Sequence, residues 1–218
     1  WQGTEKEAIT IRDLLSMSSG LEFDMIADNV TMPLASDMSE LAVEAPLVHS
    51  PGLLWEYNNH SVQALEPVLR NATGMAADVY ANQHLFAPMG MDVDWKRDDS
   101  GQPALYMNAR TSCRDNARFG YLHLRNGCWR GERLLSEEWV SESTSPSTTM
   151  NRGYGYYWWL NGEQPTLDSV TFSMRSKPLS PALRREYSTG CEALNVVLSC
   201  HSRTPPLLLL RMTAYSCP

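Results

Sequence analysis

Apolar residues recur at helical spacing in several short stretches of the chain, most of them before residue 145. The helices that this pattern predicts cover about residues 9–17, 59–72, 75–86 and 112–126, with a further short helix starting at Ser136. Thr10 and Ser112 each precede an aspartate by three residues, which is a capping pattern at a helix start. Pro67 is out of place in the second helix, because proline removes one helical hydrogen bond and kinks the axis.

Strand patterns concentrate towards the end of the chain. Residues 153–160 are rich in aromatic side chains and predict one strand, and residues 195–198 and 207–212 predict two more. Residues 22–50 have no clean period and predict a long surface excursion. Helices first and strands last indicate an α+β fold.

Composition and charge narrow the possible functions. The chain is 43% hydrophobic and 20% charged, as in ordinary globular proteins, and its net charge is −7. Residues 1–109 carry 5 Lys and Arg against 16 Asp and Glu, whereas residues 110–218 carry 13 against 9. An acidic chain without a basic run argues against nucleic-acid binding. No run of about 18 apolar residues occurs, so no membrane span is expected. Oligomeric state and compartment (cytoplasmic or periplasmic) stay open.

No metal or organic cofactor is expected. The five cysteines include no C-x-x-C pair, and no histidine pair has metal-ligand spacing. Their odd number predicts free thiols rather than a disulfide framework. The acidic residues 92–99 lack the Gly and closing Glu of a calcium loop, so we expect them to be solvated loop charges.

Five motifs follow one another across residues 9–160. They are Ile9–Leu21, Pro51-Gly52 followed by Tyr57-Asn58-Asn59, Leu85–Met91, Asp115–Gly120 and Gly153–Trp158. Each motif is weak alone. Their order and spacing together resemble the class C β-lactamase-related, penicillin-recognising serine hydrolases, in which a Tyr-x-Asn motif follows a Pro-Gly turn. The opening Trp1–Thr4 is similar to the branch that contains 6-aminohexanoate-dimer hydrolases and related esterases.

The resemblance implies a β-lactamase/transpeptidase-like α+β domain, with a helical region beside part of a mixed sheet flanked by helices. Residues 1–218 would be the C-terminal part of one such domain. About 1–130 would form the helical region, and about 131–218 would supply a helix and the C-terminal strands. No cofactor is implied, and the expected substrates are small amides or esters.

The implied chemistry is acyl transfer through a serine, assisted by a lysine one helical turn later and by the Tyr-x-Asn motif. Tyr57 would then be the general base and later the acid, and Asn59 would hydrogen-bond the lysine and the substrate amide. A tyrosine acts as a base only if nearby positive charge stabilises its phenolate. Judged without the other motifs, Tyr57 is better explained as a half-buried aromatic residue at a helix start, and the Pro51-Gly52 turn and the surrounding motifs reverse that preference. Asn59 is alternatively a helix N-cap, which is compatible with its implied role.

The substrate-binding side is less well defined. Ser188-Thr189-Gly190 is the best candidate for the third motif of the family, although an ordinary turn before a strand explains it as well. Trp158, together with Trp159, is a candidate for lining the substrate cleft, and we expect at least one of the two to pack in the core.

The chain departs from the family in one respect that decides its chemistry. None of its three lysines has a serine three residues before it, because Gly3, Val93 and Met174 occupy those positions. We expect the Ser-x-x-Lys motif to lie in sequence preceding Trp1 and the 218 residues to be inactive alone. The histidines have no Gly-x-Ser-x-Gly elbow to serve, and His60 is expected to be exposed.

Three hypotheses remain. The chain is part of a longer serine hydrolase that cleaves amides or esters through an acyl-enzyme. Alternatively, it is a non-catalytic remnant or ligand-binding module of the same fold. A third interpretation is a fragment that does not fold stably alone, because missing strands would leave an unpaired sheet edge.

Overall fold

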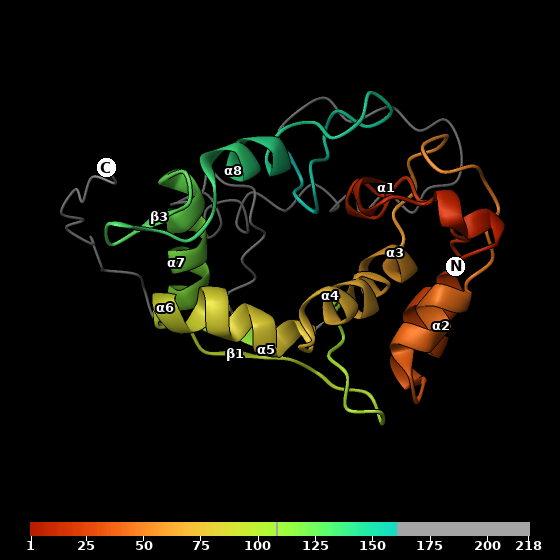
Figure 1. The fold of residues 1–218 in the computed structure, drawn as a ribbon, viewed down its shortest axis with the longest axis horizontal. Coiled ribbons are helices and arrows are strands. Elements are labelled where there is room, and N and C mark those ends of the chain that lie inside the picture. Colours follow the sequence, from red (N-terminus) through yellow and green to blue (C-terminus); the bar gives the residue numbers. More distant parts are fainter. Residues whose placement is uncertain (108, 161–218) are drawn as a thin grey trace, which may run out of the picture.

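The structure, a computed structural model, describes residues 1–107 and 109–160 (Figure 1). The helical elements are η1 (Glu5–Ala8), α1 (Ile11–Leu15), η2 (Ala27–Thr31), η3 (Met32–Leu34), α2 (Met38–Glu44), α3 (Asn59–Gln63), α4 (Leu65–Thr73), α5 (Ala77–Ala81), η4 (Asn82–Phe86), α6 (Ala87–Met89), α7 (Cys113–Leu124) and α8 (Glu137–Ser143). The strands are β1 (Val93–Asp94), β2 (Arg110–Thr111), β3 (Cys128–Trp129) and β4 (Glu132–Arg133).

The helices follow one another around an open ring. Figure 1 shows α2 to α7 along an arc, with α8 returning towards α1. A hydrogen bond from Arg12 in α1 to Glu142 in α8 joins the two sides. Two small antiparallel sheets, β1 with β2 and β3 with β4, complete an α+β fold as predicted. Within the described residues, no helix is long and apolar enough to cross a membrane.

Helix starts follow the predicted caps. Thr10 Oγ1 accepts the backbone N–H of Asp13, and the Asp13 carboxylate accepts the N–H of Thr10, completing the capping box of α1. Ser112 and Ser136 cap α7 and α8 through the backbone N–H three residues on. These bonds satisfy N–H groups that a helix start leaves unpaired. The three predicted starts are therefore confirmed.

The helix predicted over residues 59–72 is divided into α3 and α4, which meet at Ala64. Pro67 has no N–H, so the helical hydrogen bond to the carbonyl of Gln63, four residues earlier, cannot form. The proline that looked out of place in the sequence thus lies in the first turn of α4, where the missing donor costs least.

Two clusters of buried apolar residues lie in the described part of the chain. The first consists of Leu14, Leu21, Ala45 and Ala64 and joins α1, the end of α2 and the start of α4. The second consists of Met89, Met91, Leu122 and Trp129 and packs α6 against α7 and β3. The first cluster lies next to the residues of the candidate site described below.

The turn after α1 depends on Gly20. Its φ of +76° is in the left-handed region, and a Cβ atom there would lie 2.0 Å from the carbonyl oxygen of His49. The Gly20 carbonyl accepts the N–H groups of Val48 and His49 at 2.9 and 3.2 Å. Leu21 pairs with Leu47 directly after the turn. This close approach holds residues 46–49 beside α1.

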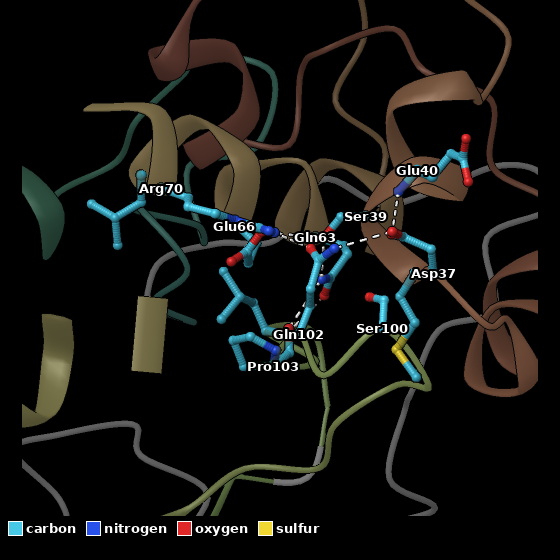
Figure 2. Close-up of polar contacts among 12 residues, drawn as sticks. Asp37, Ser39, Glu40, Gln63, Glu66, Arg70, Ser100, Gln102 and Pro103 are labelled. Atoms are coloured by element: carbon cyan, nitrogen blue, oxygen red, sulfur yellow. Dashed lines mark hydrogen bonds and ion pairs between the residues drawn. The ribbon is translucent and has the colours of Figure 1, made fainter. Parts of the chain in front are cut away.

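A buried polar network ties α3 to α2 and to residues 102–105 (Figure 2). Gln63 is fully buried, and its amide nitrogen donates to Ser39 Oγ at 3.0 Å and to the Pro103 carbonyl at 3.1 Å. Its side-chain oxygen accepts the N–H of Leu105 at 2.8 Å. One glutamine thereby connects three segments that are distant in sequence.

The same network continues through α4. Glu66 is fully buried and forms an ion pair with Arg70, which also hydrogen-bonds Gln102. Gln102 in turn donates to Asp37, the N-cap of α2, at 3.0 Å. Together these contacts fix the orientation of the α3–α4 unit, whose first turn carries the candidate site.

The prediction of one strand over residues 153–160 is wrong. Tyr154 pairs antiparallel with Trp159, and Tyr157 has a left-handed φ of 60°, so the chain reverses inside the segment. Gly155 lies so close to α8 that a Cβ atom would lie 2.2 Å from the Ser143 carbonyl oxygen. An aromatic-rich run is compatible with a strand and with a tight reversal, and packing against α8 decides between them.

The prediction of a surface excursion for residues 22–50 is also wrong. The segment contains η2, η3 and α2, and it buries four side chains almost completely: Asp28, Met32, Met38 and Ala42. Buried residues in short irregular helices produce no single period, so the pattern of the sequence did not reveal them.

Cysteine chemistry differs from the prediction as well. Cys113 and Cys128 are both disulfide-bonded, so the expectation of free thiols is wrong for these two residues. An odd count shows that at least one cysteine lacks an intramolecular partner, but it does not exclude bonds among the others. The strands predicted at residues 195–198 and 207–212 lie outside the described residues.

Candidate functional site

Tyr57 lies at the protein surface immediately before α3. Its side chain is 38% exposed, and its ring stacks on Trp159 with centroids 6.0 Å apart and an interplanar angle of 18°. The preceding residue, Glu56, donates its N–H to the carbonyl of Met17 at 2.9 Å. Tyr57 is thus fixed against the turn after α1 while part of its ring stays open to solvent.

Two further aromatic side chains complete a wall beside Tyr57. We call Trp55, Tyr57, Tyr154 and Trp159 the aromatic corner. Trp55 meets Tyr154 and Trp159 edge to face at 5.4 and 6.1 Å, and Tyr154 meets Trp159 at 4.9 Å. Tyr154 is buried, whereas Trp159 is 41% exposed. The reversal at residues 153–160 therefore brings a partly open indole to the Tyr-x-Asn motif, about a hundred residues earlier in the chain.

Asn58, rather than Asn59, is the N-cap of α3. Its Oδ1 accepts the Ser61 N–H at 2.9 Å, and its Nδ2 donates to the carbonyls of Leu21 and Glu22, both at 2.9 Å. The N-cap interpretation of Asn59 is therefore wrong. Asn59 is only partly buried, and among the described residues its Oδ1 accepts no hydrogen bond. Its side chain remains available to a ligand or another segment.

A buried carboxylate lies directly behind this motif. Asp28 in η2 is fully buried, and its Oδ1 accepts the Asn59 N–H at 2.9 Å. His60 is only 4% exposed, with Nδ1 3.6 Å from Asp28 Oδ1. The expectation that His60 is exposed is therefore wrong: in α3 its ring points back towards η2. Burial raises the pKa of Asp28, and the nearby His60 and the N–H groups of Asn59 and Asp24 offset this only partly.

The surroundings of Tyr57 favour its neutral form. Burial raises the pKa of the Tyr57 phenol, and the negative charge of Asp28 raises it further. Near neutral pH the phenol is then protonated, so it can donate a hydrogen bond but cannot accept a proton. A general base at this position needs a cation close to the hydroxyl, and within residues 1–107 and 109–160 no cation lowers this pKa.

The serines near Tyr57 are structural. Ser19 and Ser61 are buried, and their hydroxyls bond each other at 2.8 Å. In the described part of the chain, no serine hydroxyl is hydrogen-bonded to a lysine or histidine side chain. An activated serine needs such a base. These contacts agree with the lack of Ser-x-x-Lys in the sequence.

Among the described residues, the remaining predicted site residue is Trp158, which packs against α7. Trp158 stacks on Phe119 of α7 with centroids 6.0 Å apart and approaches His123 at 4.7 Å. Its neighbour Trp159 is the one that contacts Tyr57. Burial lowers the pKa of His123, whose ring lies against Trp158. Ser188-Thr189-Gly190 lies outside the described residues.

Sequence reasoning missed Asp28 and the burial of His60 altogether. Asp28 follows no motif, and only its contacts reveal its position. The expectation of purely solvated charges at residues 92–99 is wrong for Asp98, whose carboxylate accepts the N–H groups of Met38 and Gln102. The described residues contain no group of three or more His, Cys, Asp or Glu that could hold a metal ion.

Comparison with known proteins identifies the family. The beta-lactamase family profile matches residues 1–176. The fold is similar to a structure from Bacillus anthracis described as a putative 6-aminohexanoate-dimer hydrolase, with 21% identity and a TM-score of 0.64, over 72% of this chain and 48% of the other. A putative beta-lactamase from Bacteroides dorei DSM 17855 gives 22% identity and a TM-score of 0.62, over 72% and 54%.

The chain also has a sequence relative among known proteins. The protein flp of Staphylococcus aureus (strain MW2) is 27% identical over 90 residues, which is 40% of this chain and 18% of that protein. The chain thus spans about half the length of the solved structures above and less of this relative. Because the family profile covers most of the chain and the fold agrees with it, the chain belongs to the beta-lactamase family.

Proposed function

We propose that this chain is part of a serine hydrolase that cleaves small amides or esters through an acyl-enzyme, with Tyr57 as proton-transfer residue and Asn59 as substrate-orienting residue. The observation that carries the proposal is the position of the motif. Tyr57 is partly exposed at the start of α3 beside an open aromatic wall, and the Asn59 side chain has a free acceptor next to it.

The reaction needs a serine and a lysine, which the proposal assigns to sequence outside these 218 residues. The serine Oγ attacks the substrate carbonyl carbon while its proton passes to the Tyr57 oxygen. The leaving amine or alcohol then takes that proton as its bond to the carbonyl breaks, and water later hydrolyses the ester to the serine. The lysine ammonium would offset the effect of Asp28 and allow Tyr57 to ionise.

The aromatic corner supports a substrate with an apolar or aromatic group. Trp159 exposes a large apolar face beside Tyr57, and such faces contribute most to binding when a flat apolar group covers them. Trp158 would support Trp159 from behind, since its own ring lies against α7. Ser188-Thr189-Gly190 would close the other side of the cleft.

The test compares this chain with the product of the same gene extended upstream to its start codon. We expect the longer product to hydrolyse p-nitrophenyl butyrate or a short linear amide, and the 218 residues alone to be inactive. Tyr57→Phe should lower kcat by about 10²- to 10⁴-fold, the usual contribution of general acid–base catalysis. Tyr80→Phe, in α5, is the matched control and should leave kcat unchanged. Full activity of Tyr57→Phe would remove Tyr57 from the mechanism.

The environment of Tyr57 also favours a second candidate, a ligand-binding module without turnover. A protonated phenol beside an indole and a free amide oxygen can bind a ligand without reacting with it. This candidate predicts that the longer product lacks Ser-x-x-Lys and binds the ester without hydrolysing it. Turnover that is abolished by a serine-directed phosphonate would contradict it.

A further inference from the structure

Asp28 stands out among the buried polar residues because its contacts converge on the candidate site. Its Oδ1 accepts the Asn59 N–H at 2.9 Å, and its own carbonyl accepts the Asn59 side-chain amide at 3.4 Å. Its Oδ2 accepts the Asp24 N–H at 3.2 Å, which closes the turn that leads into η2. The carboxylate therefore ties η2 to the first residue of α3.

The ring of His60 lies beside this carboxylate. Its ring is buried, Nδ1 lies 3.6 Å from Asp28 Oδ1, and in the described residues this nitrogen has no hydrogen-bond partner. A buried carboxylate is costly unless it is paired and hydrogen-bonded. A fold that retains such a group next to a motif residue uses it either to fix geometry or to set charge.

We propose that Asp28 and His60 form a buried positioning pair for the Tyr57–Asn59 motif, in which Asp28 holds the Asn59 backbone and side chain and His60 keeps the Asp28 carboxylate in register. This inference rests on the proposed function, since it assigns the pair to the same site. Asp28 and His60 are buried behind the motif, so they act through Tyr57 and Asn59.

The electrostatics support this assignment. The charge of Asp28 raises the pKa of Tyr57 and also that of Glu56, after the larger effect of burial in each case. One carboxylate thus acts on both residues that precede the N-cap of α3, while it accepts a hydrogen bond from the first residue of that helix. A substitute for Asp28 that keeps an acceptor oxygen should change only the charge near Tyr57. A substitute without the polar group should change both this charge and the position of Asn59.

The test uses the 218-residue chain and requires no turnover. Hydrogen exchange of the Asn59 amide reports the geometry, and the titration of the Tyr57 ring carbon in ¹³C-tyrosine-labelled protein reports the charge. Asp28→Asn keeps an oxygen acceptor for the Asn59 N–H but removes the charge. We expect the midpoint of the Tyr57 titration to shift to lower pH. The protection of the Asn59 amide from exchange should be largely kept.

Asp28→Ala removes both the acceptor oxygen and the charge. The Asn59 amide should then exchange at least about tenfold faster, as expected for the loss of one charge-assisted hydrogen bond. His60→Gln should also speed this exchange in the wild-type background, but not in Asp28→Ala. Asp92→Asn, an exposed acid outside the site, is the control and should change neither signal.

Two results would overturn the proposal. The first is an unchanged Tyr57 midpoint together with unchanged Asn59 protection in both Asp28 variants. The second is additive effects of His60→Gln and Asp28→Ala, because additivity would show that the two side chains act independently. A longer gene product without hydrolytic activity would contradict the proposed function but would leave these two signals as they are.

Discussion

Gln63 offers the sharpest test of how the fold supports the site. Its three hydrogen bonds connect α3 to α2 and to residues 103–105, and its side chain is fully buried (Figure 2). Gln63→Ala removes all three and leaves the partly buried Leu105 N–H without an acceptor. At about 1 kcal/mol for each bond, plus about 1–2 kcal/mol for the unpaired N–H, the free energy of unfolding should fall by about 4–5 kcal/mol.

The loss is measured by urea unfolding followed by circular dichroism, with hydrogen exchange at Leu105 as the local reporter. Gln83→Ala in η4 is the matched control. Gln83 is exposed, and its side chain forms no hydrogen bond with any described residue. It should change stability by less than about 0.5 kcal/mol. If Gln63→Ala falls within the same range, or if Leu105 exchange is unchanged, the network does not hold α3 and the reasoning fails.

Two further predictions concern other segments. Burial alone would raise the pKa of Asp98, but hydrogen bonds from the Met38 and Gln102 N–H groups and from Ser100 outweigh it and lower the pKa. Its stabilising effect is therefore complete above the unfolded-state pKa and disappears as the pH falls through the folded-state value. Asp98→Asn should lower the free energy of unfolding by about 1 kcal/mol at pH 7 and leave it unchanged near pH 2. Asp99→Asn should leave it unchanged at either pH. Urea unfolding at several pH values measures both variants. Gly155→Ala forces a Cβ atom against the Ser143 carbonyl and should lower the free energy of unfolding by about 2–3 kcal/mol, measured by urea unfolding; equal stability would refute the close packing on α8.

Local chemistry in the sequence was enough to predict the helix starts. Thr10, Ser112 and Ser136 cap their helices as expected, because a cap depends only on the residues within one turn. The family resemblance also came from short motifs in order, and the family profile confirms it. Information of this kind is contained in the sequence itself.

The composition of the site was less predictable. Trp158 and Trp159 are adjacent and chemically identical, and only the reversal at Tyr157 decides which of them faces Tyr57. Asp28 lies in a segment without a period, so its contact with Asn59 depends on how η2 packs. Contacts between distant segments have no local sequence pattern, and for this reason the burial of His60 was also missed.

For Tyr57 itself, the two candidate functions differ by a single positive charge beside its hydroxyl. As described, the phenol has a buried carboxylate behind it and an indole over its ring, and both surroundings favour the neutral form. An ammonium group about 4 Å from the hydroxyl would favour the phenolate by up to about 4 kcal/mol near a protein surface, and by less here because Tyr57 is partly exposed. That attraction opposes the effects of burial and of Asp28, so the same aromatic corner would serve a hydrolase when the serine and the lysine are present and a binding site when they are not. The Asp28–His60 pair has a purpose in either case, since it holds Asn59 in place whether or not the neighbouring phenol exchanges a proton.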